Sequence, residues 1–291
     1  TCSKEKNVLK SFAILPEYQG EGLAATMITR LMDKLLEEGN ETFFVFTKPA
    51  NKGVFTSLGF QALYEGKNAV LLESGFSTIK DYLKKIIKIN NIDILRPRAA
   101  IVMNCNPFTL GHRFLIEKTA EENEEVIVFL VEEDKSLFPY GIRYRLLKEG
   151  IKDIKGVKVI PGGNYIISSA TFPNYFIKEE NQRLKAYAEV DAGIFYKHIA
   201  KALNITKRYV GQEPFCSITS QYNETLKAMA EEYAIKLIEV PRVCKEHEAI
   251  SASSVRKLLL QGDIEKALSL VPPSTGAFIA SLEGRGLIDN R

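Results

Sequence analysis

Apolar runs without polar alternation mark several short strands in the second two thirds of the chain. Residues 100–103 read Ala-Ile-Val-Met, residues 126–131 read Val-Ile-Val-Phe-Leu-Val, and residues 157–160 form a third run. Such runs are typical of a parallel sheet covered on both faces. Helical periodicity separates them, as over residues 140–152, so the pattern predicts an α/β fold with a doubly wound parallel sheet from residue 98 onward. Further strands or helices are predicted over residues 178–203, 208–210, 221–234, 236–241 and 255–260.

A different order of elements precedes this region. A β-branched and aromatic run over residues 8–15 predicts a strand that ends at Pro16, and a glycine-rich turn then leads into a helix that ends at Gly39-Asn40. A strand over residues 42–47, a helix over residues 51–58 and a strand pair complete the region. Because a strand pattern begins almost directly after Thr1, we expect a further piece of this domain to precede it.

An amphipathic helix over residues 77–89 and the polar run 90–98 separate the two regions. The predicted segments are a first domain, a linker helix with the boundary, and a second domain, over residues 1–76, 77–97 and 98–291.

Charge and cysteine usage exclude several classes of protein. Lysine and arginine number 39 against 36 aspartate and glutamate, a formal net charge of +3 that predicts no nucleic-acid partner. No apolar window is long enough to predict a membrane span. The four cysteines form no CxxC pair and the three histidines are dispersed, so we expect reduced thiols in a cytoplasmic protein and no protein-held metal.

The turn after the strand at residues 100–103 is the first candidate for chemistry. It reads Asn104-Cys105-Asn106-Pro107-Phe108-Thr109-Leu110-Gly111-His112 and opens a helical pattern. Ligands of doubly wound sheets bind outside the carboxyl ends of the strands, and a helix N-terminus there offers unpaired N–H groups to an anion. The turn therefore predicts an anion site that includes His112.

A hydroxyl cluster at a second helix start matches this site. The run Ile250-Ser251-Ala252-Ser253-Ser254-Val255-Arg256 places three serines and a guanidinium at the beginning of a helix. Capping that helix needs only one hydroxyl, whereas three hydroxyls and an arginine suit phosphate oxygens.

Together the two runs resemble the signatures of the nucleotidyltransferase superfamily, (His/Thr)-x-Gly-His and Ile-Ser-Ser-Thr-x-Ile-Arg. Thr109 takes the place of the first histidine, as in the phosphopantetheine adenylyltransferase branch, and Asn106 stands where many members have aspartate. The resemblance implies a catalytic part for His112, Thr109 and Arg256, with His112 at the α-phosphate and Gly111 allowing close approach of the nucleotide. The residues that we expect to bind ATP are Asn104, Asn106, Phe108, Gly111, Arg143, Gly211, Glu213, Ser251, Ser253 and Ser254. For Arg143, a solvated surface position is an equally good interpretation.

The turn Gln19-Gly20-Glu21-Gly22-Leu23-Ala24 resembles the loop with which GNAT-type acetyltransferases grip the pyrophosphate of acetyl-CoA. The resemblance implies that Gln19, Gly20, Gly22 and Ala24 bind a pantetheine or CoA-like group. No histidine, cysteine or other base accompanies the turn, so a binding or docking module without chemistry is at least as good an interpretation.

The combination of the two halves resembles the citrate lyase ligase family, to which the runs at residues 168–173 and 211–215 are also similar. That resemblance implies an AMP-forming acid–thiol ligase that uses ATP and Mg²⁺ to activate acetate as acetyl-AMP, with Mg²⁺ bridging phosphate oxygens. The acetyl group would pass to the prosthetic-group thiol on the acyl carrier subunit of citrate lyase. Two alternatives stay open: an adenylyltransferase that acts on a phosphorylated metabolite such as phosphopantetheine, and a non-catalytic docking factor for a carrier protein.

Overall fold

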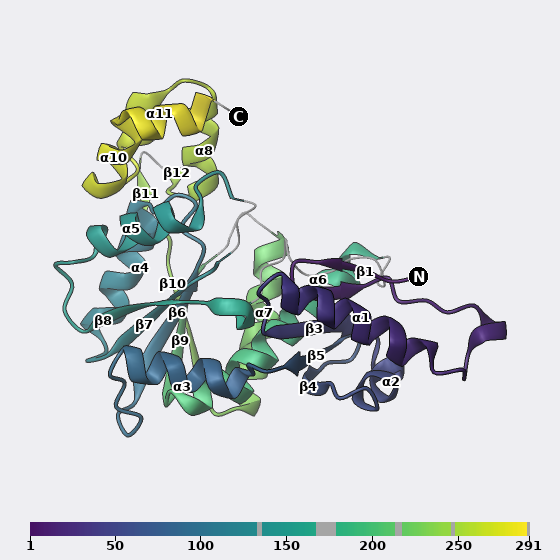
Figure 1. Ribbon diagram of the computed structural model, residues 1–291. Coiled ribbons are helices and arrows are strands. Elements are labelled where there is room, and N and C mark those ends of the chain that lie inside the picture. Colours follow the sequence, from purple (N-terminus) through teal and green to yellow (C-terminus); the bar gives the residue numbers. More distant parts are fainter. Residues whose placement is uncertain (133–135, 167–178, 213–216, 246–247, 290–291) are drawn as a thin grey trace.

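Two five-stranded sheets carry the fold in the computed structural model, which describes residues 1–132, 136–166, 179–212, 217–245 and 248–289 (Figure 1). The first sheet has the order β1-β2-β3-β5-β4 and the second the order β10-β9-β6-β7-β8. The elements of the first unit are β1 (Ser3–Glu5), β2 (Val8–Lys10), α1 (Leu23–Glu37), β3 (Thr42–Thr47), α2 (Lys52–Thr56), β4 (Gln61–Glu65) and β5 (Val70–Gly75).

The predicted strand over residues 8–15 is wrong in length. β2 ends at Lys10, and Ser11 takes a left-handed conformation with φ of 52°. That turn removes residues 11–15 from the parallel ladder that β2 forms with β3. The other predicted elements of this unit are confirmed, with ends that differ by a few residues.

The second unit has the predicted alternation of strands and helices. Its elements up to the last strand of the sheet are α3 (Ile79–Ile89), β6 (Arg98–Met103), α4 (Leu110–Glu121), β7 (Val126–Leu130), α5 (Tyr140–Gly150), β8 (Val157–Pro161), α6 (Glu180–Ile194), a π-helical turn (Phe195–Ala200), β9 (Ile205–Gly211), α7 (Ser217–Glu232) and β10 (Lys236–Val240). No helix in the described ranges is long and apolar enough to cross a membrane.

All neighbouring strands of the second sheet are parallel, and the chain reverses its direction of travel across the sheet at β6. From β6 it adds β7 and β8 on one side, and then β9 and β10 on the other. The doubly wound fold is therefore confirmed. The gap between the carboxyl ends of β6 and β9 is the switch point, where such sheets bind ligands.

The chain continues past the sheet into a hairpin and a helical cap that stands above the carboxyl ends of the strands (Figure 1). Of the helices in this cap, the sequence patterns predict only the one that directly follows the hairpin. Phe278, in the cap, packs against Phe138 with ring centroids 6.0 Å apart. The elements are β11 (Cys244–Lys245), β12 (Glu248–Ala249), α8 (Ala252–Leu260), α9 (Ile264–Leu268), α10 (Pro273–Ala280) and α11 (Leu282–Asp289).

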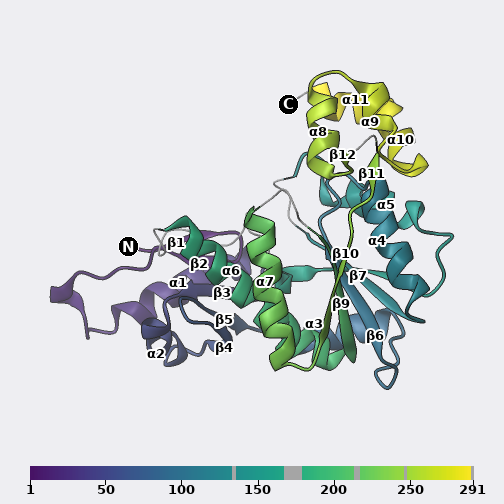
Figure 2. The same ribbon diagram turned by 180° about the vertical axis from the view of Figure 1, so that it is seen from behind.

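Helices α6 and α7 lie between the two sheets in both views of the molecule (Figures 1 and 2). α6 contacts β4 of the first sheet, and α7 contacts β10 of the second. The approach of α6 to β4 requires glycine at position 193, because a Cβ there would lie 2.2 Å from the Tyr64 ring. The two sheets are thus joined by packed helices.

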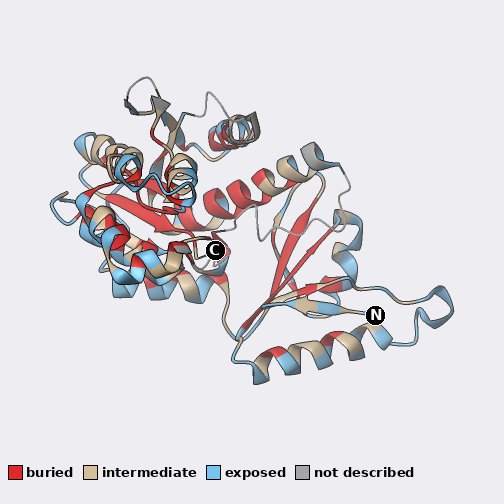
Figure 3. Ribbon diagram, turned by 90° about the horizontal axis from the view of Figure 1, so that it is seen from above, coloured by how far each residue is buried: buried red, intermediate tan, exposed pale blue. Residues whose placement is uncertain are grey.

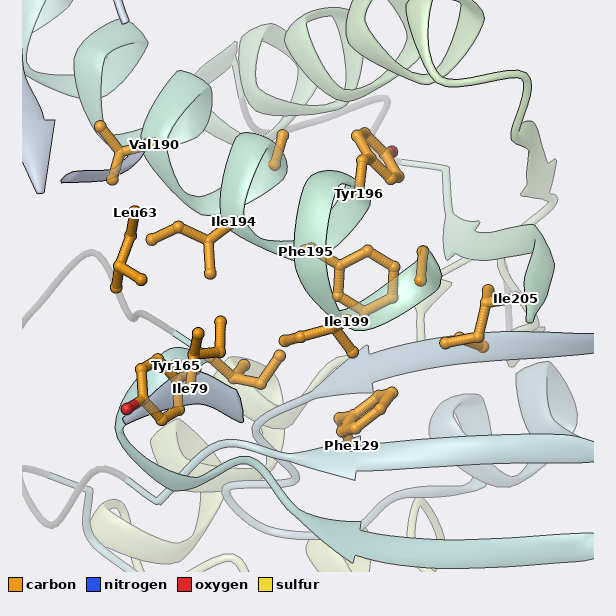
Figure 4. Close-up of a cluster of buried hydrophobic side chains, with 14 of the residues drawn as sticks. Leu63, Ile79, Phe129, Tyr165, Val190, Ile194, Phe195, Tyr196, Ile199 and Ile205 are labelled. Carbon is orange, nitrogen blue, oxygen red and sulfur yellow. The ribbon is translucent and has the colours of Figure 1, made fainter. Parts of the chain in front are cut away.

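One hydrophobic cluster, which we call the shared core, runs from the first sheet to the second (Figure 4). It contains Leu63 of β4, Ile194 of α6 and Phe129 of β7, each less than 5 % exposed. The predicted linker helix is α3, and its apolar face also lies in this core. Buried residues accordingly follow the strands of both sheets and the helix faces between them (Figure 3). Two further clusters cover the remaining sheet faces.

Candidate functional site

The start of α4 is held by reciprocal hydrogen bonds between Thr109 and His112. The Thr109 backbone N–H donates to His112 Nδ1 over 3.1 Å, and the His112 N–H donates to Thr109 Oγ1 over 3.3 Å. This arrangement is a capping box in which histidine takes the usual place of glutamate or glutamine. Because Nδ1 accepts a hydrogen bond, the proton of the neutral ring belongs on Nε2. His112 is therefore set up as a neutral donor through Nε2.

The surroundings of His112 favour this neutral form. Its ring stacks on the buried Phe108, with centroids 6.1 Å apart and an interplanar angle of 19°. Burial, together with the positive charge of Arg242, lowers the pKa of His112 from 6.5 to about 4. The imidazole is uncharged at neutral pH, so it offers a phosphate a directed hydrogen bond rather than a full charge.

We expect a nuclear magnetic resonance titration to find His112 neutral down to about pH 5. The folded pKa lies below the unfolded one, so the unfolded chain binds more protons between the two values. The contribution of His112 to folding stability is thus fully present above pH 6.5 and is lost as the pH falls toward 4. Adding ATP should raise this pKa, because the phosphates favour the imidazolium. An apo pKa of 6 or higher would contradict the assignment.

The start of α8 carries the predicted hydroxyl cluster. Ser251 Oγ lies 2.9 Å from Ser253 Oγ and accepts a 3.0 Å hydrogen bond from the Ser254 N–H. Arg256, on the same helix, donates to the carbonyl of Asn106 in the β6–α4 turn. The two motifs, about 140 residues apart in the sequence, are therefore in direct contact.

Gly111 explains how closely the two helix starts approach. A Cβ at this position would lie 2.9 Å from the carbonyl oxygen of Ile250. Glycine is thus required by the neighbouring backbone. Its expected contact with a nucleotide stays a prediction.

A cavity of about 440 Å³ opens between these helix starts and the carboxyl ends of β6 and β9. Three guanidinium groups line it, those of Arg208, Arg242 and Arg256, and among the described lining residues there is no aspartate or glutamate. The first turns of α4 and α8 add their positive dipole ends. The cavity therefore suits a ligand that carries several negative charges.

Most predicted ATP-site residues line this cavity, and three do not. Phe108 lies behind the His112 ring, Ser254 turns its hydroxyl to Ser251, and Arg143 is fully buried. Those that line it are Asn104, Asn106, Thr109, Gly111, His112, Gly211, Ser251, Ser253 and Arg256. Thr109 is only 1 % exposed, and its hydroxyl is used in the capping box. Glu213 lies outside the described residues, as does the run 168–173.

Arg143 positions the turn from outside the cavity. Its Nη1 donates to the carbonyl oxygens of Asn104 and Val131 over 2.6 and 2.8 Å, and its Nε donates to that of Phe138 over 2.9 Å. These bonds tie the ends of β6 and β7 to the segment before α5. Arg143 is therefore neither a phosphate ligand nor a solvated surface residue. It is a buried structural residue that holds these backbone segments together.

Four cavity residues with a charged, hydroxyl or amide side chain were not predicted from the sequence: Arg208, Tyr222, Asn223 and Arg242. Arg208 did carry a signal, because it is a charged residue inside the strand run that ends at Gly211. Tyr222 and Asn223 carry none, since they look like ordinary positions of an amphipathic helix. Asn223 is held beside the carboxyl end of β9, because its side-chain amide donates a hydrogen bond to the Gly211 carbonyl over 3.2 Å.

A second cavity, of about 1000 Å³, lies in the first unit. Gly20 and Gly22 have φ of 91° and 74°, left-handed values that let the turn bend into α1. Lys10 and Lys48 line the same cavity. All four residues predicted to bind a pantetheine-like group line it, namely Gln19, Gly20, Gly22 and Ala24.

Cys105 lines the first cavity but is not available as a nucleophile. Its side chain has no exposed surface, and burial raises the pKa of the thiol far above its usual value. The thiolate is the reactive form of cysteine. An acyl group formed in this cavity would therefore not pass to Cys105.

The doubly wound sheet, the arginine-lined cavity at its switch point and the preceding α/β unit define a two-part α/β protein with a site for an anionic ligand. Family models support both parts: one for the acetyltransferase (GNAT) domain matches residues 1–70, and one for the citrate lyase ligase C-terminal domain matches residues 98–279. The chain belongs to the citrate lyase ligase family, and it is an enzyme of the ligase class.

Curated relatives agree over almost the whole chain. A [citrate [pro-3S]-lyase] ligase from Klebsiella pneumoniae is 39 % identical over 95 % of this chain and 82 % of its own length. The enzyme of that name from Escherichia coli (strain K12) is 38 % identical over 95 % of this chain and 80 % of its own length. Among solved structures, a putative nicotinate-nucleotide adenylyltransferase from Vibrio parahaemolyticus superposes with a TM-score of 0.42 and 18 % identity, over 64 % of this chain and 99 % of its own.

Proposed function

We propose that this protein activates acetate with ATP, forms acetyl-AMP and pyrophosphate, and then acetylates the prosthetic-group thiol on the acyl carrier subunit of citrate lyase. The observation that carries the proposal is the switch-point cavity, in which three arginines, two helix N-termini and a neutral His112 face one space. The family membership supplies the acceptor: the relatives are named for citrate lyase.

The first step would place a carboxylate oxygen of acetate on the α-phosphorus of ATP, while the bond from that phosphorus to pyrophosphate breaks. Negative charge then grows on the phosphoryl oxygens and on the departing pyrophosphate. His112 Nε2–H would stabilise the charge near the α-phosphate, and Arg256 with the serines of α8 would hold the departing group. Acetate is already ionised, so this step needs no general base.

Magnesium would enter with the nucleotide. Among the described residues, none of the cavity lining is a carboxylate that could hold the ion directly. Phosphate oxygens and water would therefore supply its ligands, as is usual for Mg²⁺. The ion would offset phosphate charge.

In the second step a thiol sulfur would attack the carbonyl carbon of acetyl-AMP, and AMP would leave as its bond to that carbon breaks. The thiol proton would be lost to solvent. Cys105 is the one cysteine among the described residues that line this cavity, and it is buried, so the acceptor thiol is expected to come from outside the chain. The second cavity, beside the turn that contains Gly20 and Gly22 in the first unit, is our candidate for holding the pantetheine part of the prosthetic group.

The expected result is acetate-dependent exchange of radiolabelled pyrophosphate into ATP, followed by reactivation of deacetylated citrate lyase. The exchange assay isolates the first step, and the reactivation assay needs both steps. Exchange that requires phosphopantetheine instead of acetate would establish the adenylyltransferase alternative. ATP binding without either exchange would favour a docking factor. Either result would overturn the proposal.

A further inference from the structure

Arg208 is a buried cation whose hydrogen-bonding capacity is only partly used. It sits on β9 and is 1 % exposed. Its Nε and Nη1 groups have no hydrogen-bond partner among the described residues. Buried guanidinium donors are normally paired, since leaving them unpaired costs free energy. Arg208 is also one of the residues that line the switch-point cavity.

The remaining contacts of Arg208 fix its orientation. Nη2 lies 3.3 Å from the Tyr222 hydroxyl, which itself donates to Asp191 over 2.5 Å, and Nη2 also forms a buried ion pair with Asp191 Oδ2 at 3.8 Å. The guanidinium also packs over the ring of Phe195, with its central carbon 4.3 Å from the centroid. One end of the group is therefore anchored to α6 and α7. The unpaired Nε and Nη1 donors belong to the rest of the group, whose position these contacts hold fixed.

Two valines stand beside Arg208 at the switch point. Arg208 pairs with Ala100 in the parallel register of β9 and β6, so Val210 and Val102 follow two residues later on the same face of the sheet. Both valines line the cavity. This corner of the cavity thus combines the guanidinium with small apolar side chains and with Tyr222 and Asn223 of α7. The α4 and α8 corner offers hydroxyls, N–H groups and arginines.

We propose that Arg208 binds the carboxylate of the acid substrate, and that Val102 and Val210 contact its methyl group and limit chain length. The inference rests on the proposed function, because it assigns the second substrate of that reaction. A short monocarboxylate suits this corner better than a phosphate does, because Asp191 already offsets part of the Arg208 charge and the valines add no further positive group. Arg208 would act as a specificity-determining residue that orients the attacking oxygen.

The test compares Arg208→Gln with Arg98→Gln, a buried arginine at the other end of the same sheet that pairs with Glu125. Loss of charge-assisted hydrogen bonds predicts that Arg208→Gln raises KM for acetate roughly 10- to 150-fold. KM for ATP should change less than about threefold, because the proposed function assigns the phosphates to His112, Arg256 and the serines of α8. Arg98→Gln should change neither constant. If Arg208→Gln does not fold, Arg208→Lys should show the same selective rise, smaller in size.

A second variant probes the methyl contact. Val210→Ala enlarges the corner by two methyl groups, so the ratio of kcat/KM for propionate to that for acetate should rise. A general loss of structure would lower both values together. An unchanged ratio in Val210→Ala and in Val102→Ala would overturn the assignment of the valines.

The outcomes separate this inference from the proposed function. If wild-type protein shows acetate-dependent exchange but Arg208→Gln keeps its acetate KM, or raises KM for ATP instead, the Arg208 assignment is wrong and the function stands. If wild-type protein shows no exchange, the function is wrong. Saturation-transfer difference NMR of acetate binding to the wild-type protein and to Arg208→Gln then still tests the assignment of Arg208. Equal signals overturn the assignment, and a signal that is lost only in the variant supports it.

Discussion

His112→Ala should lower the rate of acetate-dependent ATP–pyrophosphate exchange about 10²- to 10³-fold, the usual effect of removing one preorganised donor to developing charge. The neutral imidazole receives the Thr109 N–H at Nδ1 and can donate only through Nε2. Its hydrogen bond strengthens as charge grows on the phosphoryl oxygens, so kcat falls more than ATP affinity. Rapid-quench measurement of acetyl-AMP formation, beside the Kd for ATP, checks both parts.

His112→Gln is the matched control. A glutamine three residues after Thr109 can accept the Thr109 N–H through its amide oxygen, as in an ordinary capping box, and keeps a neutral N–H donor. It should restore the start of α4 and recover part of the rate. An alanine variant that binds ATP and forms acetyl-AMP at the wild-type rate would remove His112 from the chemistry.

Ile194→Ala should lower the free energy of unfolding by about 2–5 kcal/mol, as expected for deleting a buried isoleucine side chain. Ile194 has no exposed surface, and it lies in the shared core between Leu63 and Phe129 (Figure 4). The cavity would weaken packing toward both sheets. Hydrogen exchange measured by mass spectrometry should therefore speed up in β5 and in β7 together, and one denaturant transition should persist.

Leu35→Ala provides the comparison, because Leu35 is equally buried but belongs to the cluster confined to the first unit. Its effect on exchange should be larger in β5 than in β7. If Ile194→Ala accelerates exchange in one unit only, the two sheets are independently stable and the shared core does not couple them.

The site shows which of its features a local sequence pattern can predict. Thr109 and His112 are three residues apart, so the capping box that orients the imidazole follows from short-range helix geometry. A sequence motif contains that spacing and can therefore predict it. Ser251 and Arg256 are likewise read from one helix start. Arg143 shows the limit: its chemistry suggests an anion ligand, but its partners are carbonyls of three different segments, which a linear pattern does not bring together.

The first unit shows the same limit at the level of strands. The run at residues 8–15 has strand composition throughout, yet β2 stops at Lys10. Strand ends are set by partner strands, and those are distant in sequence. The helix at residues 79–89 was expected as a linker, and its amphipathic pattern is correct, but the pattern does not say which surfaces cover its apolar face. Those surfaces belong to both sheets.

The sequence by itself determined the alternating strands and helices, the two helix starts with their histidine, serine and arginine side chains, and the family, because these depend on periodicity and on residues close together in the chain. Only the tertiary structure decided that Arg256 reaches Asn106, that Gly111 makes room for Ile250, and that Arg208 keeps unpaired donors at the switch point. The physical reason is that these features arise from burial and from pairing between distant segments. Neither is specified until the two sheets and the helices between them have packed.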